Sequence, residues 1–130
     1  MESAGSEAFD RILLEAVDEG LQMILGKNME RVIYHWLERN HSLVMDEIPQ
    51  RLEDFHSSLE GLFGFGAAVI ERQILERLFS ELGLKYQVKR GYSFADYVMD
   101  ARKTYKMGDQ ADLQSGNRLN LIRISKNGDR

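Results

Sequence analysis

The residues of this chain that could support acid–base or metal chemistry are three histidines, His35, His41 and His56, and many carboxylates. His35 and Glu38 are three residues apart, which is the spacing of a Glu/His metal-binding face on a helix. Helical di-metal sites need that arrangement twice, with further carboxylates from facing helices. The chain has no HExxH segment and no cysteine, so it offers neither a zinc-protease helix nor a thiolate ligand. The sequence therefore predicts no metal site, no cofactor and no catalytic residue.

The glycine-rich run at residues 61–66, GLFGFG, stands before a predicted helix and invites comparison with phosphate-binding loops. Its spacing matches neither GxGxxG nor GxxxxGK[ST], and no strand is predicted before it. The aromatic residues Phe63 and Phe65 indicate a packed turn. His56 is followed by two serines, but the chain has no GxSxG nucleophile elbow. We therefore predict a joint between two helices here, and a chain that is not an enzyme.

Charge is distributed unevenly along the chain, although the net charge is only −4. Residues 1–84 carry a balance of −9, residues 85–106 carry +4 and residues 107–130 carry +1. Because phosphate neutralisation drives nucleic-acid binding, an acidic domain is a poor general binder of nucleic acid. The basic segment keeps one local alternative open. The candidate nucleic-acid-binding residues are Lys85, Lys89, Arg90, Arg102, Lys103 and Lys106. The last three also suit the C-terminal end of a helix, where positive charge complements the dipole.

Length and composition indicate one globular domain. The chain has 130 residues, of which 43% are hydrophobic and 29% charged, and it has a single proline. That balance is ordinary for a globular protein, and the abundance of Leu, Glu, Arg and Ala favours helix. No apolar run approaches the ~18 residues of a membrane span. The acidic start, MESAGSEAFD, lacks the charged and then apolar pattern of a signal peptide, so we expect a cytoplasmic protein.

Apolar residues at three- and four-residue steps predict five helices, over about residues 7–25, 27–39, 49–63, 67–82 and 93–107. Gly26 is the expected break or kink between the first two, which form either two helices, the preferred interpretation, or one bent helix. Asn40 and His41 are the expected exit of the second. Residues 41–50 are predicted to be irregular, and 84–90 an extended crossover. Ser93 and Asp96 have the spacing of a capping box at the start of the fifth helix. The expected organisation is a disordered N-terminus at 1–6, a helical bundle at 7–107 and a flexible tail at 108–130.

The apolar stripes of these helices predict the core. The first stripe is Phe9, Ile12, Leu13, Ala16, Val17, Leu21 and Ile24. The second is Met29, Val32, Ile33, Trp36 and Leu37, and the third is Leu52, Phe55, Leu59, Leu62 and Phe63. The fourth is Ile70, Ile74, Leu75, Leu78, Phe79 and Leu82, and the fifth is Phe94, Tyr97, Val98, Ala101 and Tyr105. The solvent face of the fourth helix is expected to hold Glu71 and the ion pairs Arg72–Glu76 and Arg77–Glu81.

Three segments carry a family resemblance: IYHWLERN at residues 33–40, the long stretch from EIPQRLEDF to LGLKY at residues 47–86, and SFADYVMDAR at residues 93–102. Over residues 10–106 the chain resembles the archaeal "Nitrosopumilus output domain" family of the fifth type, formerly classed as a domain of unknown function. The resemblance implies a small all-helical module with a signalling-output role. It implies no catalytic residues.

Taken together, the sequence predicts a non-enzymatic interaction or signalling-output module, an all-α bundle of about five helices that binds a protein partner or self-associates through an apolar helix face. Two alternatives stay open. One is a nucleic-acid-binding regulator that uses the basic segment 85–106. The other is a small-ligand sensor with a pocket under Phe63 and Phe65.

Overall fold

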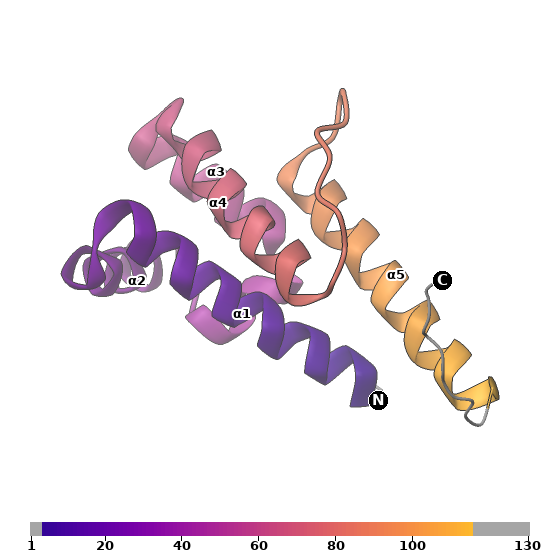
Figure 1. The fold of residues 1–130 in the computed structure, drawn as a ribbon. Helices are drawn as coiled ribbons and strands as arrows, with labels where there is room; N and C mark the ends of the chain where they lie inside the picture. The colour runs from indigo at the N-terminus through magenta and orange to yellow at the C-terminus, as the bar shows by residue number, and fades with distance from the viewer. Residues whose placement is uncertain (1–3, 116–130) are drawn as a thin grey trace.

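The computed structural model describes residues 4–115, and side chains from 7 to 106, and it is an all-α bundle (Figure 1). The helices are α1 (Ala4–Leu25), α2 (Lys27–His41), α3 (Leu52–Phe63), α4 (Gly66–Glu81) and α5 (Phe94–Ser115), with a short 3₁₀ helix, η1 (Met45–Gln50), before α3. No strand occurs between residues 4 and 115. The predicted fold class is confirmed.

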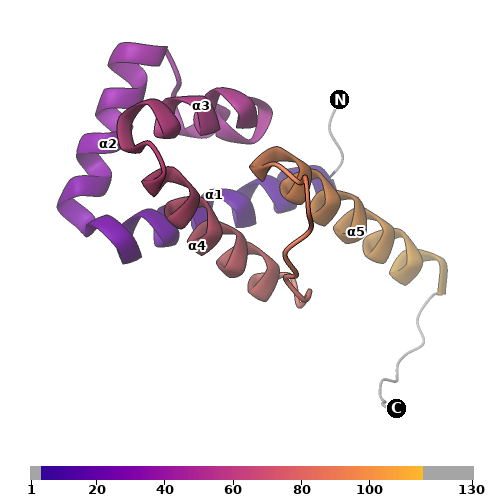
Figure 2. The same cartoon turned by 90° about the horizontal axis from the view of Figure 1, so that it is seen from above.

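The bundle is built around the antiparallel pair α1 and α4, which make the most extensive helix–helix contact (Figures 1 and 2). Their backbones approach closely at Gly20. A methyl group on Gly20 would lie 2.6 Å from Cγ1 of Ile74 and 3.0 Å from its backbone nitrogen. Only glycine allows this approach, so Gly20 is a packing residue inside a helix. α2 covers one end of the pair and α5 the other (Figure 2).

The core follows the predicted stripes of α1, α4 and α5 in most positions. Its largest fully buried side chains include Phe9 and Phe55, and around them pack further side chains from all five α-helices. Trp36 is half-buried against this core and also meets the His41 ring edge-on at 4.7 Å. Four residues that were predicted to be buried are instead exposed: Ile24, Met29, Val32 and Leu62. Each lies near a helix end or on α2, where fewer neighbouring helices are available to cover the stripe.

The boundary between α1 and α2 falls where the sequence predicts it. Gly26 has φ 87°, outside helical geometry, so residues 4–41 form two helices. Two details differ. The first helix begins at Ala4 and not near residue 7, so part of the N-terminus that was expected to be disordered is helical. The left-handed residue that ends α2 is Ser42, with φ 49°, and not Asn40.

The connection between α2 and α3 was predicted to be irregular, but residues 45–50 form η1. The side chain of Glu47 accepts a hydrogen bond from the backbone N–H of Val44 at 3.3 Å and so holds the start of η1. Arg51 then donates to Asp54 at 2.9 Å and to the carbonyl of Ser42 at 2.7 Å. Because Pro49 is accommodated in η1, α3 begins at Leu52 and not at Pro49.

The segment between α4 and α5 is an extended crossover, as predicted, and it runs alongside α5 (Figure 1). Gly83, at φ 71°, ends α4, and the N–H of Leu84 reaches back to the carbonyl of Phe79 at 2.8 Å. The capping box of α5 is confirmed. The N–H of Ser93 donates to Asp96 at 3.0 Å, and the N–H of Asp96 donates to the Ser93 hydroxyl at 3.1 Å.

α5 is longer than the sequence predicts. It passes through Gly108 and ends at Ser115, so the helix continues beyond the expected domain boundary at 107. A single glycine costs a helix about 1 kcal/mol, which neighbouring turns can offset. Residues 1–3 and 116–130, which include most of the expected tail, lie outside the described residues.

Candidate functional site

Two ionisable side chains, one on α3 and one on α4, meet in a partly buried setting. Nδ1 of His56 lies 2.6 Å from Oε2 of Glu71. The Glu71 side chain is only 8% exposed, whereas that of His56 is 36% exposed. Glu60, one helical turn after His56, places Oε1 at 3.7 Å from the other ring nitrogen, Nε2. The result is a row of carboxylate, imidazole and carboxylate that runs from the interior to the surface.

The electrostatics of this pair are set mainly by burial. Burial raises the pKa of Glu71, while the hydrogen bond and the charge of His56 act in the opposite direction. A buried carboxylate needs such a donor, because an unpaired one would carry the full cost of desolvation. Glu71 therefore fixes the imidazole so that Nδ1 faces inward and Nε2 faces the surface.

The sequence predicted Glu71 on the solvent face of α4, and that was wrong. The signal that could have found it is its position: Ala67, Glu71, Ile74 and Leu78 follow one another at three- and four-residue steps on the buried side of the helix. Glu30 was missed in the same way. It is 4% exposed in the first turn of α2, where it accepts a hydrogen bond from Gln22 at 3.1 Å.

Chemically, the His56 row can hold a proton and orient a ring. Among the side chains from residue 7 to residue 106, no three His, Asp or Glu residues are arranged to hold a metal ion. The hydroxyl of Ser58 donates to the carbonyl of Asp54 at 2.7 Å, one turn back on its own helix. This hydroxyl is therefore engaged with the backbone and not with His56. The pair accordingly links α3 to α4 by a hydrogen bond between His56 and Glu71.

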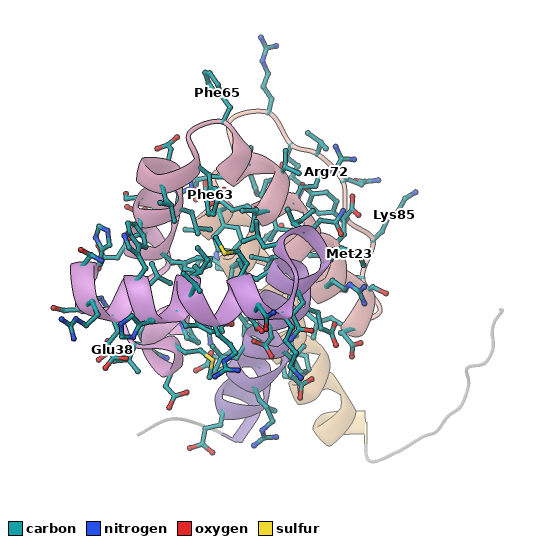
Figure 3. The ribbon with its side chains drawn as sticks, turned by 90° about the vertical axis from the view of Figure 1, so that its left-hand side faces the viewer. Met23, Glu38, Phe63, Phe65, Arg72 and Lys85 are labelled. Atoms are coloured by element: carbon teal, nitrogen blue, oxygen red, sulfur yellow. The ribbon has the colours of Figure 1, made fainter. Side chains whose placement is uncertain are left out.

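The joint between α3 and α4 presents a surface of another kind. Gly64 has φ 58° and ψ −128°, a conformation open to glycine, and it turns the chain so that Phe65 points away from the bundle (Figure 3). Phe65 is 99% exposed, whereas Phe63 is half-buried and packs against the core. The expected packed turn is therefore only half correct.

Two further apolar side chains near the joint face solvent. Val69, one turn after Phe65 on α4, is 56% exposed, and Leu62, in the last turn of α3, is 40% exposed. We call Leu62, Phe65 and Val69 the joint surface. Exposed apolar side chains that gather into one patch mark contact sites on proteins more often than single exposed ones do.

The six basic candidates divide into two groups. The Arg102 guanidinium is 14% exposed, lies 2.8 Å from Asp10 Oδ1 and stacks over the Phe9 ring at 4.6 Å. Lys89 lies 3.1 Å from Asp100. The other four are exposed and make no ion pair within the described side chains: Lys85, Arg90, Lys103 and Lys106. Arg102 is thus a structural residue that ties α5 to α1.

The predicted surface ion pairs of α4 are half correct. Arg72 lies 3.0 Å from Glu76, as expected. Arg77 turns instead toward Glu19 of α1, at 3.5 Å, and not toward Glu81.

Tyr97, which lies within the basic segment, belongs to the core. It is buried, and its hydroxyl accepts a hydrogen bond from the backbone N–H of Lys89 at 2.7 Å.

Comparison with known proteins gives no match to a family model, to a curated protein or to a solved structure. The family resemblance therefore stays a prediction. Among residues 4–115, no helix has the length and apolar character needed to cross a membrane.

Proposed function

We propose that this chain is a non-enzymatic interaction module, with the signalling-output role that the family resemblance implies, and that it binds a protein partner through the joint surface. The observation that carries the proposal is the complete exposure of Phe65 at a joint whose backbone directs it outward. The alternative of a small-ligand sensor would need a pocket under Phe63 and Phe65. Three hollows in the surface, at residues 49–54, 28–35 and 90–103, are lined by other residues and so do not support that alternative.

The energetics of association favour such an anchor. Phenylalanine and other aromatic side chains bury about 150–250 Å² each and dominate contact energies. A phenylalanine side chain has only two torsion angles, so it loses less conformational entropy than a long flexible side chain when a partner covers it. The His56–Glu71 hydrogen bond links α3 to α4 about two helical turns from the joint, and so helps to keep the joint in one geometry.

The test is capture of a partner from a lysate of the source cells on immobilised full chain, followed by affinity measurement with the purified partner. The variants are wild type, Phe65→Asp and, as a matched control, Val88→Asp. Val88 is also exposed and apolar, at 71%, but lies in the crossover segment. Because neither side chain is buried, both variants should retain the wild-type Tm.

We expect one partner to be held by wild type and by Val88→Asp and to be lost with Phe65→Asp. With that partner purified, Phe65→Ala should weaken binding by more than about thirtyfold, the loss of about 2 kcal/mol that is typical of a hot-spot residue. A partner held equally by wild type and Phe65→Asp would contradict the proposal, as would the absence of any partner specific to the folded chain.

A further inference from the structure

A second surface, away from the joint, has features that suit contact with another copy of the chain. Met99 on α5 is 47% exposed and borders two hollows. The first, of about 390 Å³, lies between α5 and residues 49–54 at the start of α3. The second, of about 440 Å³, lies between α5 and residues 90–92. Met99 is the one residue that lines both of them.

The first hollow carries surplus negative charge. Arg51 is its one cation, and it is shared by Asp54 at 2.9 Å and Glu47 at 3.1 Å. Glu53, which also lines this hollow, is exposed and has no ion-pair partner among residues 7–106. We call this hollow the acidic hollow.

The second hollow carries surplus positive charge. Two acids, Asp96 and Asp100, line it together with two cations, and Lys89, which pairs with Asp100, adds a third cation beside it. Arg90 and Lys103 line the same hollow, are exposed, and make no ion pair within the described part of the chain. We call this hollow the basic hollow.

We propose that two copies of this chain pair across a twofold axis at Met99, with the acidic hollow of each copy facing the basic hollow of the other. A twofold interface brings one patch against the same patch of a second molecule, so it needs a surface that complements itself. The surface around Met99 complements itself, because the opposite charges lie in two hollows that share this apolar side chain. Glu53 of one copy then faces Arg90 and Lys103 of its partner, twice in each dimer.

The same charge arrangement explains why the second copy fits better than nucleic acid. A phosphate backbone would meet the basic hollow favourably, but it would also be repelled by the acidic hollow beside it. Since no residue of the joint surface lines either hollow, pairing at Met99 leaves both joint surfaces open. The dimer would thus present two copies of Phe65, and a partner with two sites would bind it with an avidity that a monomer lacks.

The experiment is sedimentation equilibrium of the full chain, at low and at high salt, on a charge-reversal set. Glu53→Arg and Lys103→Glu each place like charges opposite one another at both symmetric contacts. In the double variant, Glu53→Arg/Lys103→Glu, the contact between positions 53 and 103 is restored with its signs exchanged, while Arg90 is unchanged. An equimolar mixture of the two single variants should pair as well, since each chain then complements the other.

We expect the wild type to dimerise with a dissociation constant on the order of 10 to 100 μM, as suits a small interface, and more weakly at high salt. Each single variant, and Met99→Asp, should dimerise at least about tenfold more weakly, because every change acts twice per dimer. The double variant and the mixture should dimerise more tightly than either single variant alone, because the contact between positions 53 and 103 is attractive again. Val88→Asp serves as the control and should leave the constant unchanged.

A wild type that stays monomeric at about 1 mM would overturn the proposal, and so would a double variant that is no better than either single one. Equal weakening by Val88→Asp would also overturn it. Phe65→Asp separates this proposal from the preceding one, because it should abolish partner capture and leave the dimer intact. Unchanged circular dichroism spectra for all variants show that the fold is retained.

Discussion

Nδ1 of His56 and Oε2 of Glu71 lie 2.6 Å apart, and this contact joins the two helices that meet at the joint. It puts a carboxylate with a side-chain exposure of 8% next to a ring that still reaches solvent. The pair therefore couples the packing of α3 against α4 to the protonation of Glu71, whose pKa is raised mainly by burial.

The first prediction concerns the pH dependence of stability. The pKa of Glu71 is raised in the folded chain, mainly by burial, above its unfolded value of about 4.3. Its contribution to the free energy of unfolding is therefore fully present below the unfolded pKa and is lost as the pH rises through the folded pKa. Glu71→Gln keeps an acceptor for His56 but cannot ionise. The stability of this variant relative to wild type should rise between pH 4 and pH 7.

Urea unfolding of both chains across that range measures the difference, and His56→Ala provides the complementary variant. Removing the donor leaves Glu71 buried without its partner, which should cost roughly 1–3 kcal/mol at pH 7 and less at pH 4. A stability difference between Glu71→Gln and wild type that narrows as the pH rises would contradict this account.

The second prediction concerns Gly20, where α1 and α4 cross. Gly20→Ala would place a methyl group 3.0 Å from the backbone nitrogen of Ile74, so the helices must separate. We expect a loss of about 1–3 kcal/mol, the range seen when extra atoms are forced into a packed core. Gly61→Ala is the matched control, because it is also inside a helix but has nothing within 4 Å of the added group.

For Gly61→Ala we expect a gain of up to about 1 kcal/mol, since alanine is the better helix former and no neighbour must move. Thermal unfolding of the two variants beside wild type gives opposite shifts in Tm. Similar shifts in both would mean that helix propensity, and not the contact with Ile74, controls position 20.

The third prediction compares two ion pairs that involve aspartates. Asp10 and Arg102 are 16% and 14% exposed and lie 2.8 Å apart, whereas Asp100 and Lys89 are more than 40% exposed and lie 3.1 Å apart. Asp10→Ala leaves a mostly buried guanidinium without its carboxylate and should cost roughly 3 kcal/mol. Asp100→Ala breaks an exposed pair and should cost less than about 1 kcal/mol.

Chemical denaturation gives both values, and raising the salt concentration should reduce only the effect of Asp100→Ala. Equal losses would show that burial does not distinguish the two pairs. Gln50 also donates to Asp10, at 3.1 Å, so Gln50→Ala measures the share of the Asp10 loss that is not due to Arg102.

The fourth prediction concerns the capping box of α5. Ser93→Ala removes the acceptor for the N–H of Asp96 and should cost about 1 kcal/mol. Ser93→Asp keeps an acceptor at the same place and should be close to wild type. Hydrogen exchange should show faster exchange in the first turn of α5 for Ser93→Ala alone. Slow exchange in that turn would mean that the crossover segment, and not the cap, holds the start of the helix.

The sequence alone determined the helix boundaries that depend on one residue or on close neighbours in the chain. Gly26 separates α1 from α2, Gly83 ends α4 and Ser93 with Asp96 starts α5, because each depends on a backbone conformation or a hydrogen bond between near neighbours. The apolar stripes of α1, α4 and α5 can be predicted for the same reason, since helical periodicity is a local property of the sequence. Together these features determined the helix number and the all-α class.

Tertiary structure decided the rest. Glu71 is an ordinary surface residue by type, and it is buried only because His56 on another helix supplies a donor for it. Phe65 is a core residue by type, and it is exposed because Gly64 turns the joint outward. Arg102 belongs by its position to a basic patch, yet it is held by Asp10, more than ninety residues away in the chain. In each case the type of the residue suggests the wrong environment, because burial depends on how the helices and the joint are placed in the folded chain.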